Sequence, residues 1–495
     1  MELLLALDVG TTHLKAAAFT LEGHLYLLER TKTKTVDLGE GRAIYHPEEL
    51  WSEVAGLIKR LTARLSPDDQ IVSLAAASMA EAGLFIDAQG KPLTPIMVWY
   101  DARGKEVMEE WYSQVSPEQC FAITGLNYNY IYSLFKMLWT KENQPELYSQ
   151  AAHWLCVPDF INYRLTGELA TDYSIAGRTL LFDIKERNWS KPLLDLAGLD
   201  GTLLPPVAPS GTCIGRITQE AAAQTGLPEG IPVALGGHDH ICGALAAGVV
   251  EPGRVLDSMG TSESVIAVFD QLPELEREAF SGFNAGCHVV PDLYYIQGSI
   301  HGSGKSVDWY VREFATSLEA FLAEAEGAHP GAQGLFYVPH LRGGGPPVRS
   351  PHSKACFVGL RDYHTKADFA RSLQEGLCLE VNLVLQSMEK VLGREFGKIH
   401  AIGGGTRNEL WLSLKSTISQ KVVEVPQVEE ATLLGAALLG GIGAGVFKGH
   451  REASAAVYQL GRSYSPDPDL TGKYAEIYQT YLAIVPLVRE LSSRI

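Results

Sequence analysis

Three short polar turns in this sequence could bind phosphate. The first reads DVGTT at residues 8–12, the second GTS at residues 260–262 and the third GGGTRN at residues 403–408. Glycine lets backbone N–H groups approach an anion closely, and hydroxyl side chains donate hydrogen bonds to phosphate oxygens. Each turn alone is explained equally well as an ordinary turn between regular elements. Three such turns in one chain favour a phosphate or nucleotide site.

Two carboxylates stand where strands are predicted to end. Asp8 follows the apolar residues 3–7, and a carboxylate there can bind Mg²⁺ directly or through water. Asp239 follows the apolar residues 231–235 and two glycines, at the carboxyl end of a strand, where open α/β sheets place ligands. Asp239 could accept the proton of a hydroxyl nucleophile. The residue pattern fits a helix N-cap nearly as well.

Two other patterns look like functional motifs and are rejected. The segment GSIHGSGKS at residues 298–306 resembles a Walker A loop, but position 299 is Ser299, so its first glycine is misplaced by one residue. His238 and His240 flank Asp239 like metal ligands. Adjacent side chains diverge on a strand or turn, and no other Cys or His has ligand spacing, so a metal role is disfavoured.

Hydrophobic periodicity indicates the elements that position these residues. It predicts strands at 3–7, 14–20, 25–30 and 71–77, with a helix at 47–65. A strand at 231–235 precedes a helix of small residues at 241–247. The strand–turn–strand unit around residues 8–12 recurs around residues 260–262, half a chain later. We therefore expect an α/β fold of two similar halves, with domains at 1–250 and 251–495.

Composition excludes several classes of partner. The 495 residues include 41 Lys+Arg and 58 Asp+Glu, which gives a formal charge of −17. This acid excess argues against nucleic acid and against an anionic membrane surface. The seven cysteines are scattered and contain no CxxC pair, and the first residues lack a signal peptide. A reduced, cytoplasmic protein is expected.

Several ordered segments resemble the FGGY family of carbohydrate kinases over residues 3–446. The segments that carry the resemblance are LDVGTT at 7–12, VWYDAR at 98–103, KMLW at 136–139, DFINYRLTG at 159–167, GGHD at 236–239, GTS at 260–262, GL at 359–360, SLQEG at 372–376, GGGTRN at 403–408 and EATLLGAA at 430–437. The resemblance implies two ribonuclease H-like domains, as in actin and hexokinase, that face a central cleft holding ATP. We interpret the segments at 136–139 and 359–376 as packing and hinge pieces.

The resemblance also implies roles for individual residues. Asp239 matches the catalytic base that accepts the hydroxyl proton, and Asp8 matches a carboxylate near Mg²⁺. Lys15 either contacts the phosphates or is exposed on its strand. The residues that match the ATP-binding loops are Gly10, Thr11, Thr12, Gly260, Thr261, Gly404, Gly405 and Asn408.

The segment at residues 78–87 should face the sugar, and it departs from two known patterns. Xylulokinases carry Gln-Met-His-Gly there and glycerol kinases carry Asn-Gln-Arg-Glu-Thr; Glu81 aligns with the glutamate of the second pattern, whereas Ala80 replaces the arginine or the histidine. A carboxylate can accept two hydroxyl hydrogen bonds, so Glu81 is expected to bind the substrate. Trp99 and Asp101 match residues near the sugar in relatives, and His301 is a further candidate; Trp99 could equally belong to the core.

The expected function is ATP-dependent phosphorylation of a ketose or polyol of three to six carbons, with a ketopentose such as xylulose or ribulose preferred. Glycerol, erythritol or another polyol is the alternative substrate. An ATPase related to actin or the heat-shock chaperones is the alternative of another class. A sugar-responsive repressor is disfavoured, since the sequence starts at the first strand without a helix-turn-helix. Expected ligands are ATP, Mg²⁺ and one small sugar; a homodimer is left open.

Overall fold

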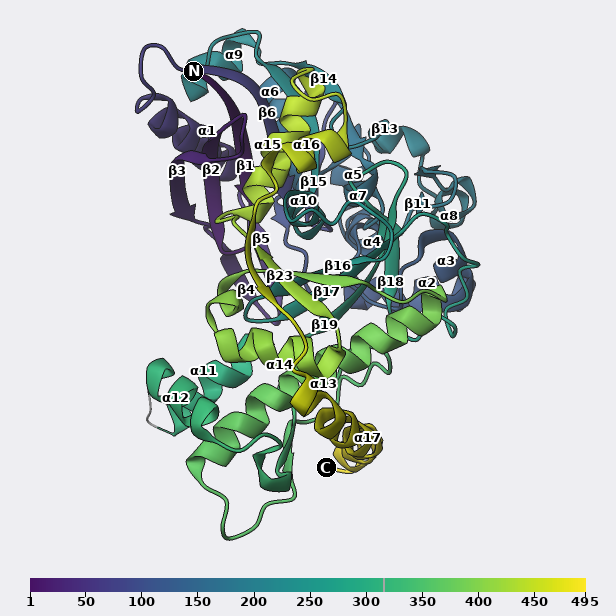
Figure 1. The fold of residues 1–495 in the computed structure, drawn as a ribbon. Coiled ribbons are helices and arrows are strands. Elements are labelled where there is room, and N and C mark those ends of the chain that lie inside the picture. The colour runs from purple at the N-terminus through teal and green to yellow at the C-terminus, as the bar shows by residue number, and fades with distance from the viewer. Residues whose placement is uncertain (315–316) are drawn as a thin grey trace.

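The first half of the chain contains a six-stranded sheet (Figure 1). The computed structural model describes residues 1–314 and 317–495. The apolar residues of β1 point alternately to both faces, so this strand is buried on both sides. The strands β1, β6 and β15 are parallel, and β2 and β3 extend β1 as an antiparallel meander. The sheet order is β14 (Cys213–Arg216), β15 (Pro232–His238), β6 (Gln70–Ser78), β1 (Glu2–Val9), β2 (His13–Thr20) and β3 (Leu25–Lys32).

A seven-stranded sheet in the second half repeats this pairing. There β16 pairs antiparallel with β17 and parallel with β22, as β1 pairs with β2 and with β6. The predicted recurrence of the strand–turn–strand unit is therefore confirmed. The order is β18 (Asn284–Cys287), β19 (Tyr294–Ile300), β17 (Glu263–Phe269), β16 (Arg254–Met259), β22 (Lys398–Ile402), β23 (Val422–Pro426) and β24 (Leu460–Tyr464).

Helices cover both faces of the first sheet. Leu3, Leu5 and Leu7 of β1 pack with α1 (Pro47–Thr62), α6 (Val157–Thr166) and α9 (Gln219–Thr225). Leu4 and Ala6 point the other way, toward α10 (Asp239–Ala246), α15 (Ala431–Gly443) and α16 (His450–Val457). Residues of β16 and β17 join this second cluster, so these helices connect the two sheets.

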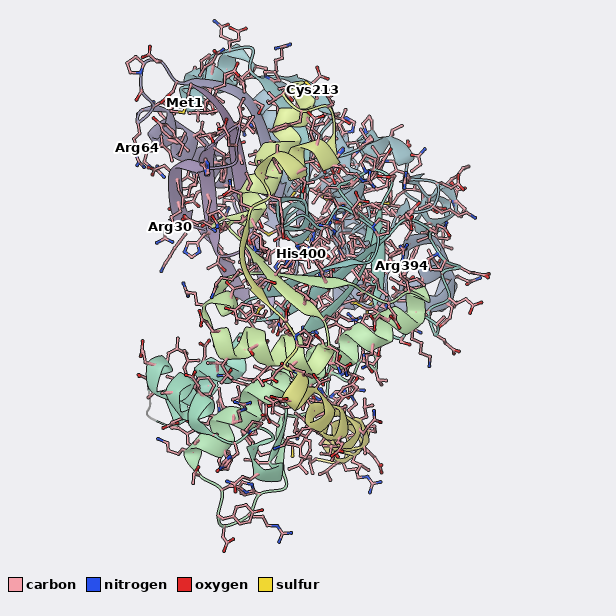
Figure 2. The ribbon with its side chains drawn as sticks, in the orientation of Figure 1. Met1, Arg30, Arg64, Cys213, Arg394 and His400 are labelled. Atoms are coloured by element: carbon pink, nitrogen blue, oxygen red, sulfur yellow. The ribbon has the colours of Figure 1, made fainter. Side chains whose placement is uncertain are left out.

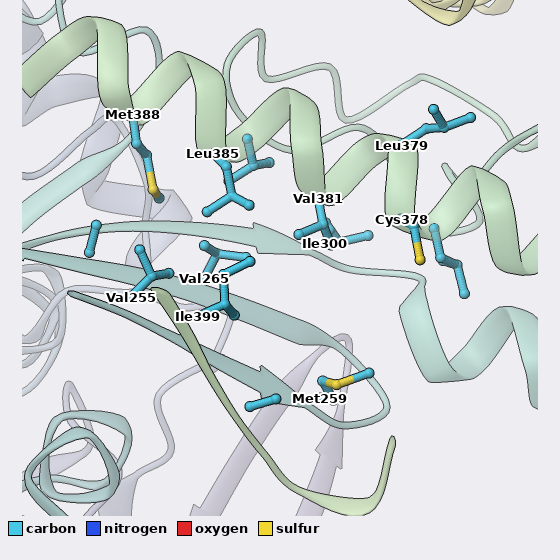
Figure 3. Close-up of a cluster of buried hydrophobic side chains, with 14 of the residues drawn as sticks. Val255, Met259, Val265, Ile300, Cys378, Leu379, Val381, Leu385, Met388 and Ile399 are labelled. Carbon is cyan, nitrogen blue, oxygen red and sulfur yellow. The ribbon is translucent and has the colours of Figure 1, made fainter. Parts of the chain in front are cut away.

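The remaining face of the second sheet is covered by α13 (Lys366–Leu392), α14 (Glu409–Ser419) and α17 (Pro468–Ser492). Figure 3 shows Val381, Leu385 and Met388 of α13 directed at Val255, Val265 and Ile399 of the strands. Next to this layer lie α11 (Ser303–Glu313), α12 (Leu318–Gly327), β20 (Phe336–Val338) and β21 (Cys356–Val358). This core therefore positions the β16–β17 hairpin, which carries the second phosphate turn, and the end of β22, where the third turn begins.

Smaller elements form an insertion in the first half, with its own cluster of buried side chains. Its strands were not predicted, because each contains only two to four residues; the first two are β4 (Val36–Gly39) and β5 (Arg42–Tyr45). The other elements are β7 (Gly83–Ile86), β8 (Ile96–Met97), β9 (His153–Cys156), β10 (Thr171–Asp172), β11 (Phe182–Asp183), β12 (Asn188–Trp189), β13 (Val207–Ala208), α2 (Gly104–Gln114), α3 (Pro117–Thr124), α4 (Ser133–Asn143), α5 (Pro145–Tyr148), α7 (Tyr173–Ala176) and α8 (Lys191–Ala197).

In the sequence, the strands of the first sheet precede residue 250 and the strands of the second sheet follow it. However, α15 and α16, from the second half of the chain, pack on the first sheet. The domain limits 1–250 and 251–495 therefore stay a proposal. All seven cysteines are free thiols, and Cys213 on the edge strand β14 is exposed (Figure 2). Among the described residues, no helix combines the length and apolar character that a membrane span requires.

Candidate active site

Three parallel strands of the first sheet end side by side. The last residue of β1, Val9, pairs with Ser78 of β6, and Ser78 pairs with His238 of β15. The segments that follow these strands hold the first phosphate turn, the Glu81 segment and Asp239. The carboxyl edge of the sheet thus brings together three groups that are far apart in the sequence, as expected for a ligand site in an α/β fold.

Asp239 is the first residue of α10, and the capping position belongs to His238. Its carboxylate accepts a hydrogen bond from the His240 N–H at 2.6 Å, and its side chain stays 29% exposed. Burial alone would raise the pKa of Asp239, but His240, His238, the backbone N–H and Arg178 together hold it below its usual range. Asp239 is therefore an ionised, accessible acceptor at neutral pH, as a general base requires.

The first phosphate turn is closed by a hydrogen bond from the Gly10 N–H to the His13 carbonyl at 3.1 Å. The Thr11 hydroxyl accepts a hydrogen bond from the Trp99 indole N–H at 3.1 Å and lies 3.7 Å from the Met79 sulfur. Thr12 is exposed. Trp99, which was predicted to lie near the sugar, therefore contacts the first phosphate turn. The sequence alone did not indicate this contact.

Asp8 and Lys15 face each other across the β1–β2 hairpin. Burial and then the charge of Asp239 raise the pKa of Asp8 to about 7; Lys15 opposes them, and Glu430 adds a smaller increase. A divalent cation would relieve both the burial and the carboxylate repulsion, so Asp8 fits a magnesium site. Across the described residues, no cluster of three His, Cys, Asp or Glu is arranged to hold a metal. A single carboxylate is still a usual protein contribution, since Mg²⁺ on a nucleotide takes most ligands from phosphates and water.

Lys15 donates to Glu430 at 2.7 Å, and both side chains are partly exposed. Glu430 immediately precedes α15, so this ion pair ties the first hairpin to a helix from the second half of the chain. The sequence predicted either contact of Lys15 with the phosphates or exposure on its strand, whereas the structure pairs it with Glu430.

The second and third glycine turns line one cavity of about 430 Å³. Gly403 and Gly405 pack directly on Met259, where a Cβ atom on either glycine would lie 2.7 Å from it. Only glycine fits at this approach, which holds the third turn against the second hairpin. The cavity is lined by Gly260, Thr261, Gly404, Gly405 and Asn408, with Gly304, Val307, Leu322 and Trp411 among their neighbours. Its polar turns and apolar wall suit the phosphates and base of a nucleotide.

Neighbouring segments fix these turns. The Gly304 and Lys305 N–H groups donate to the carbonyls of Gly260 and Thr261, at 3.2 and 3.1 Å. The rejected Walker-like segment therefore supports the second hairpin with its backbone. The Asn408 side chain accepts from the Trp411 N–H and so caps α14. His301 is exposed, and its carbonyl accepts from the Ser262 hydroxyl at 3.2 Å.

Glu81 is paired with an arginine that sequence reasoning missed. The Arg178 Nε donates to Glu81 Oε1 at 2.7 Å, and both side chains are at most 8% exposed. Arg178 comes from the turn after α7, 97 residues away. The signal was a lone arginine inside the apolar stretch 175–182, because a buried guanidinium requires an anionic partner. An arginine thus lies next to Glu81 although Ala80 replaces the arginine of the glycerol kinase pattern.

Asp101, predicted from the resemblance to lie near the sugar, has its carboxylate bonded within the protein. It is fully buried, and its oxygens accept from the Arg103 guanidinium and from the Arg103 and Ala43 N–H groups. Because these bonds occupy both oxygens, the geometry argues against direct contact with substrate. Lys136 is also fully buried and donates to the carbonyls of Trp99 and Ile131. Both residues therefore shape the turn that presents Trp99.

Comparisons with known proteins agree with this geometry. Residues 3–246 match the N-terminal domain of the FGGY family of carbohydrate kinases, and residues 256–444 match its C-terminal domain. The chain is 31% identical to a xylulose kinase of Staphylococcus epidermidis, over 99% of this chain and 98% of that protein. It is 29% identical to the L-fuculokinase of Escherichia coli K12, over 94% and 98%.

The crystal structure of xylulose kinase from Rhodospirillum rubrum is similar with a TM-score of 0.89 and 25% identity, covering 99% of this chain and 100% of that one. These findings favour a kinase over the actin-like or chaperone-like ATPase. The chain belongs to the FGGY family of carbohydrate kinases and is an ATP-dependent phosphotransferase with an alcohol group as acceptor.

Proposed function

We propose that this kinase phosphorylates a ketopentose of the xylulose or ribulose type, with Asp239 as the general base. The observation that supports the proposal is the shared edge of β1, β6 and β15, where Asp239 lies close enough to interact electrostatically with Asp8 and with Arg178 of the Glu81–Arg178 pair. The relatives named as xylulose kinases support the choice of a ketopentose. Glycerol, erythritol and other polyols or ketoses remain the alternative acceptors, and the fuculokinase relative keeps the length of the sugar open.

In this proposal the acceptor hydroxyl lies within hydrogen-bond reach of an Asp239 oxygen. The carboxylate accepts the hydroxyl proton as the oxygen attacks the γ-phosphorus of ATP and the bond to the β-phosphate oxygen breaks. The hydroxyls of Thr11, Thr12 and Thr261 would orient the phosphates, and Gly10 and Gly260, whose own N–H groups close the two turns, let the phosphates approach the backbone. Asp8 would hold Mg²⁺, which neutralises phosphate charge. A location in the cytoplasm and the oligomeric state stay predictions.

The test is ADP release from Mg·ATP over a panel of ketoses, polyols and sugar acids, followed by mass spectrometry of the product. We expect ketopentoses to give the highest kcat/KM and a product heavier by one phosphoryl group. Faster turnover of glycerol or erythritol than of any ketopentose would contradict the substrate assignment. No sugar-dependent ADP release with any acceptor would contradict the role of this site.

A further inference from the structure

Arg178 and Glu81 each keep a hydrogen-bonding atom that their ion pair does not use. The guanidinium uses Nε and Nη2 on one Glu81 oxygen, at 2.7 and 2.5 Å. Its third nitrogen, Nη1, is buried and makes no hydrogen bond of standard geometry among the described residues, although the Tyr295 hydroxyl lies beside the guanidinium; His238 Nδ1 is also unpaired there, 3.6 Å from Asp239 Oδ1. A buried donor without a partner is costly and requires an explanation, and a ligand that binds to it is one such explanation.

The turn that carries Arg178 is built onto the catalytic strand. Asp172 accepts from the Ser174 N–H at 2.8 Å and from its hydroxyl, and the Ser174 hydroxyl accepts from the His238 N–H at 2.9 Å. This chain of bonds holds the turn beside His238, which immediately precedes the proposed base. The position of Arg178 is therefore fixed relative to Asp239 and not only to Glu81.

Glu81 itself has an unusual backbone. Its φ is +64°, in the left-handed region that non-glycine residues seldom adopt, and its carbonyl accepts from the Ser133 hydroxyl at 3.2 Å. Residues held in this way concentrate at ligand sites, where the surrounding structure maintains the strain. The strained turn directs the carboxylate to Arg178 and leaves the second oxygen, Oε2, without a hydrogen bond in the described part of the chain.

We propose that Arg178 is a specificity-determining residue, which donates through Nη1 to one oxygen of the acceptor while Glu81 Oε2 accepts from a neighbouring hydroxyl. The inference rests on the proposed function, since it concerns the acceptor of the same site. The pair carries no net charge, so it suits a neutral acceptor with two adjacent oxygens. Acceptors that lack one of these oxygens, or that place a carboxylate there, are rejected, because Nη1 or Oε2 would be left unpaired or would face a like charge.

The test compares Arg178→Lys with Arg103→Lys. Both arginines are buried and pair with a carboxylate, but Asp101 is fully bonded and Arg103 is not among the residues with unpartnered buried nitrogens. Lysine keeps the positive charge that Glu81 requires and removes the planar guanidinium with its several N–H donors. We expect Arg178→Lys to lower kcat/KM for the best acceptor about 10- to 100-fold, with an unchanged KM for ATP and an unchanged unfolding midpoint.

Singly deoxygenated analogues of that acceptor give the decisive readout. In the wild type, one or two adjacent deoxygenations should reduce kcat/KM strongly, and in Arg178→Lys the penalty at those positions alone should shrink. If each deoxygenation reduces kcat/KM by the same factor in the wild type and in Arg178→Lys, the inference is overturned. An arginine with a purely structural role would change kcat/KM for all acceptors by the same factor. If the wild type phosphorylates a sugar and Arg178→Lys does so with the same kcat/KM, this inference is wrong and the proposed function stands. A wild type without any sugar-dependent ADP release overturns the proposed function, and this inference with it.

Discussion

A buried ion triad under the second phosphate turn offers a quantitative test of how the structure holds its nucleotide site. Lys415 of α14 bonds to both Asp257 of β16 and Glu263 of β17, and all three side chains are at most 1% exposed. The Ser303 hydroxyl at the start of α11 donates to the other Glu263 oxygen at 2.6 Å. One lysine thus joins α14, the second hairpin and, through Glu263, α11.

The variant Lys415→Met removes the cation and keeps a side chain of similar length. Two carboxylates would then be buried without a counter-ion, and breaking a buried pair in this way costs about 3–5 kcal/mol. We expect the free energy of unfolding to fall by that amount. Burial and Glu263 already raise the pKa of Asp257, so the folded variant binds protons more tightly than the unfolded chain. Its loss of stability should therefore be larger at pH 8 than near pH 5.5.

Urea unfolding followed by tryptophan fluorescence measures this effect, because Trp411 lies on the same helix, with its ring 5.5 Å from the lysine Nζ. The matched control is Lys421→Met, whose partner Glu389 is less buried, with side chains 12% and 16% exposed. Because this pair keeps contact with solvent, its loss should cost less than the loss of the fully buried triad. Adding Asp257→Asn and Glu263→Gln to Lys415→Met should recover part of the loss. A cost for Lys415→Met no greater than that of Lys421→Met would refute the reasoning.

Three further predictions concern the reacting groups. Asp8→Asn should lower kcat by orders of magnitude and weaken the stabilisation that Mg·ADP gives to the wild type; a thermal-shift titration in which both proteins respond alike to Mg·ADP would contradict this. Lys15→Ala should raise the KM for ATP about tenfold if the lysine leaves Glu430 for the phosphates, whereas Glu430→Gln should not; equal effects would assign both to packing. At saturating Mg·ATP, where the bound cation keeps Asp8 ionised, the lowered pKa of Asp239 should keep kcat/KM for the acceptor flat from about pH 8 down to about pH 5.5, with a fall only as the base takes up a proton; a profile that already halves near pH 7 under these conditions would identify another group.

The hairpins and their turns could be predicted because their signals are local. An apolar run that ends at Asp8 and a glycine predicts β1 and its turn, and the same pattern predicts β16. Asp239 was predicted from a strand end and two glycines. Its distinction from a helix cap needed the structure, where His238 holds the capping position.

Contacts between distant residues could not be predicted from the sequence. Lys415 and Asp257 are 158 residues apart, Glu81 and Arg178 are 97 apart, and Lys15 and Glu430 are 415 apart. The surroundings of Asp101 could not be predicted for a different reason. Its arginine partner is only two residues away, but the sequence does not indicate that bonds already occupy both carboxylate oxygens.

Sugar-dependent ADP release by Asp239→Asn tests the central claim most directly. Asparagine keeps the shape of the side chain but cannot accept the hydroxyl proton, so kcat should fall by about 10²–10⁴. ATP binding, measured by calorimetry, should stay within about twofold of the wild type, since the cavity at Gly260 and Gly404 is unchanged. Turnover by Asp239→Asn close to that of the wild type would contradict the assignment of this carboxylate as the base.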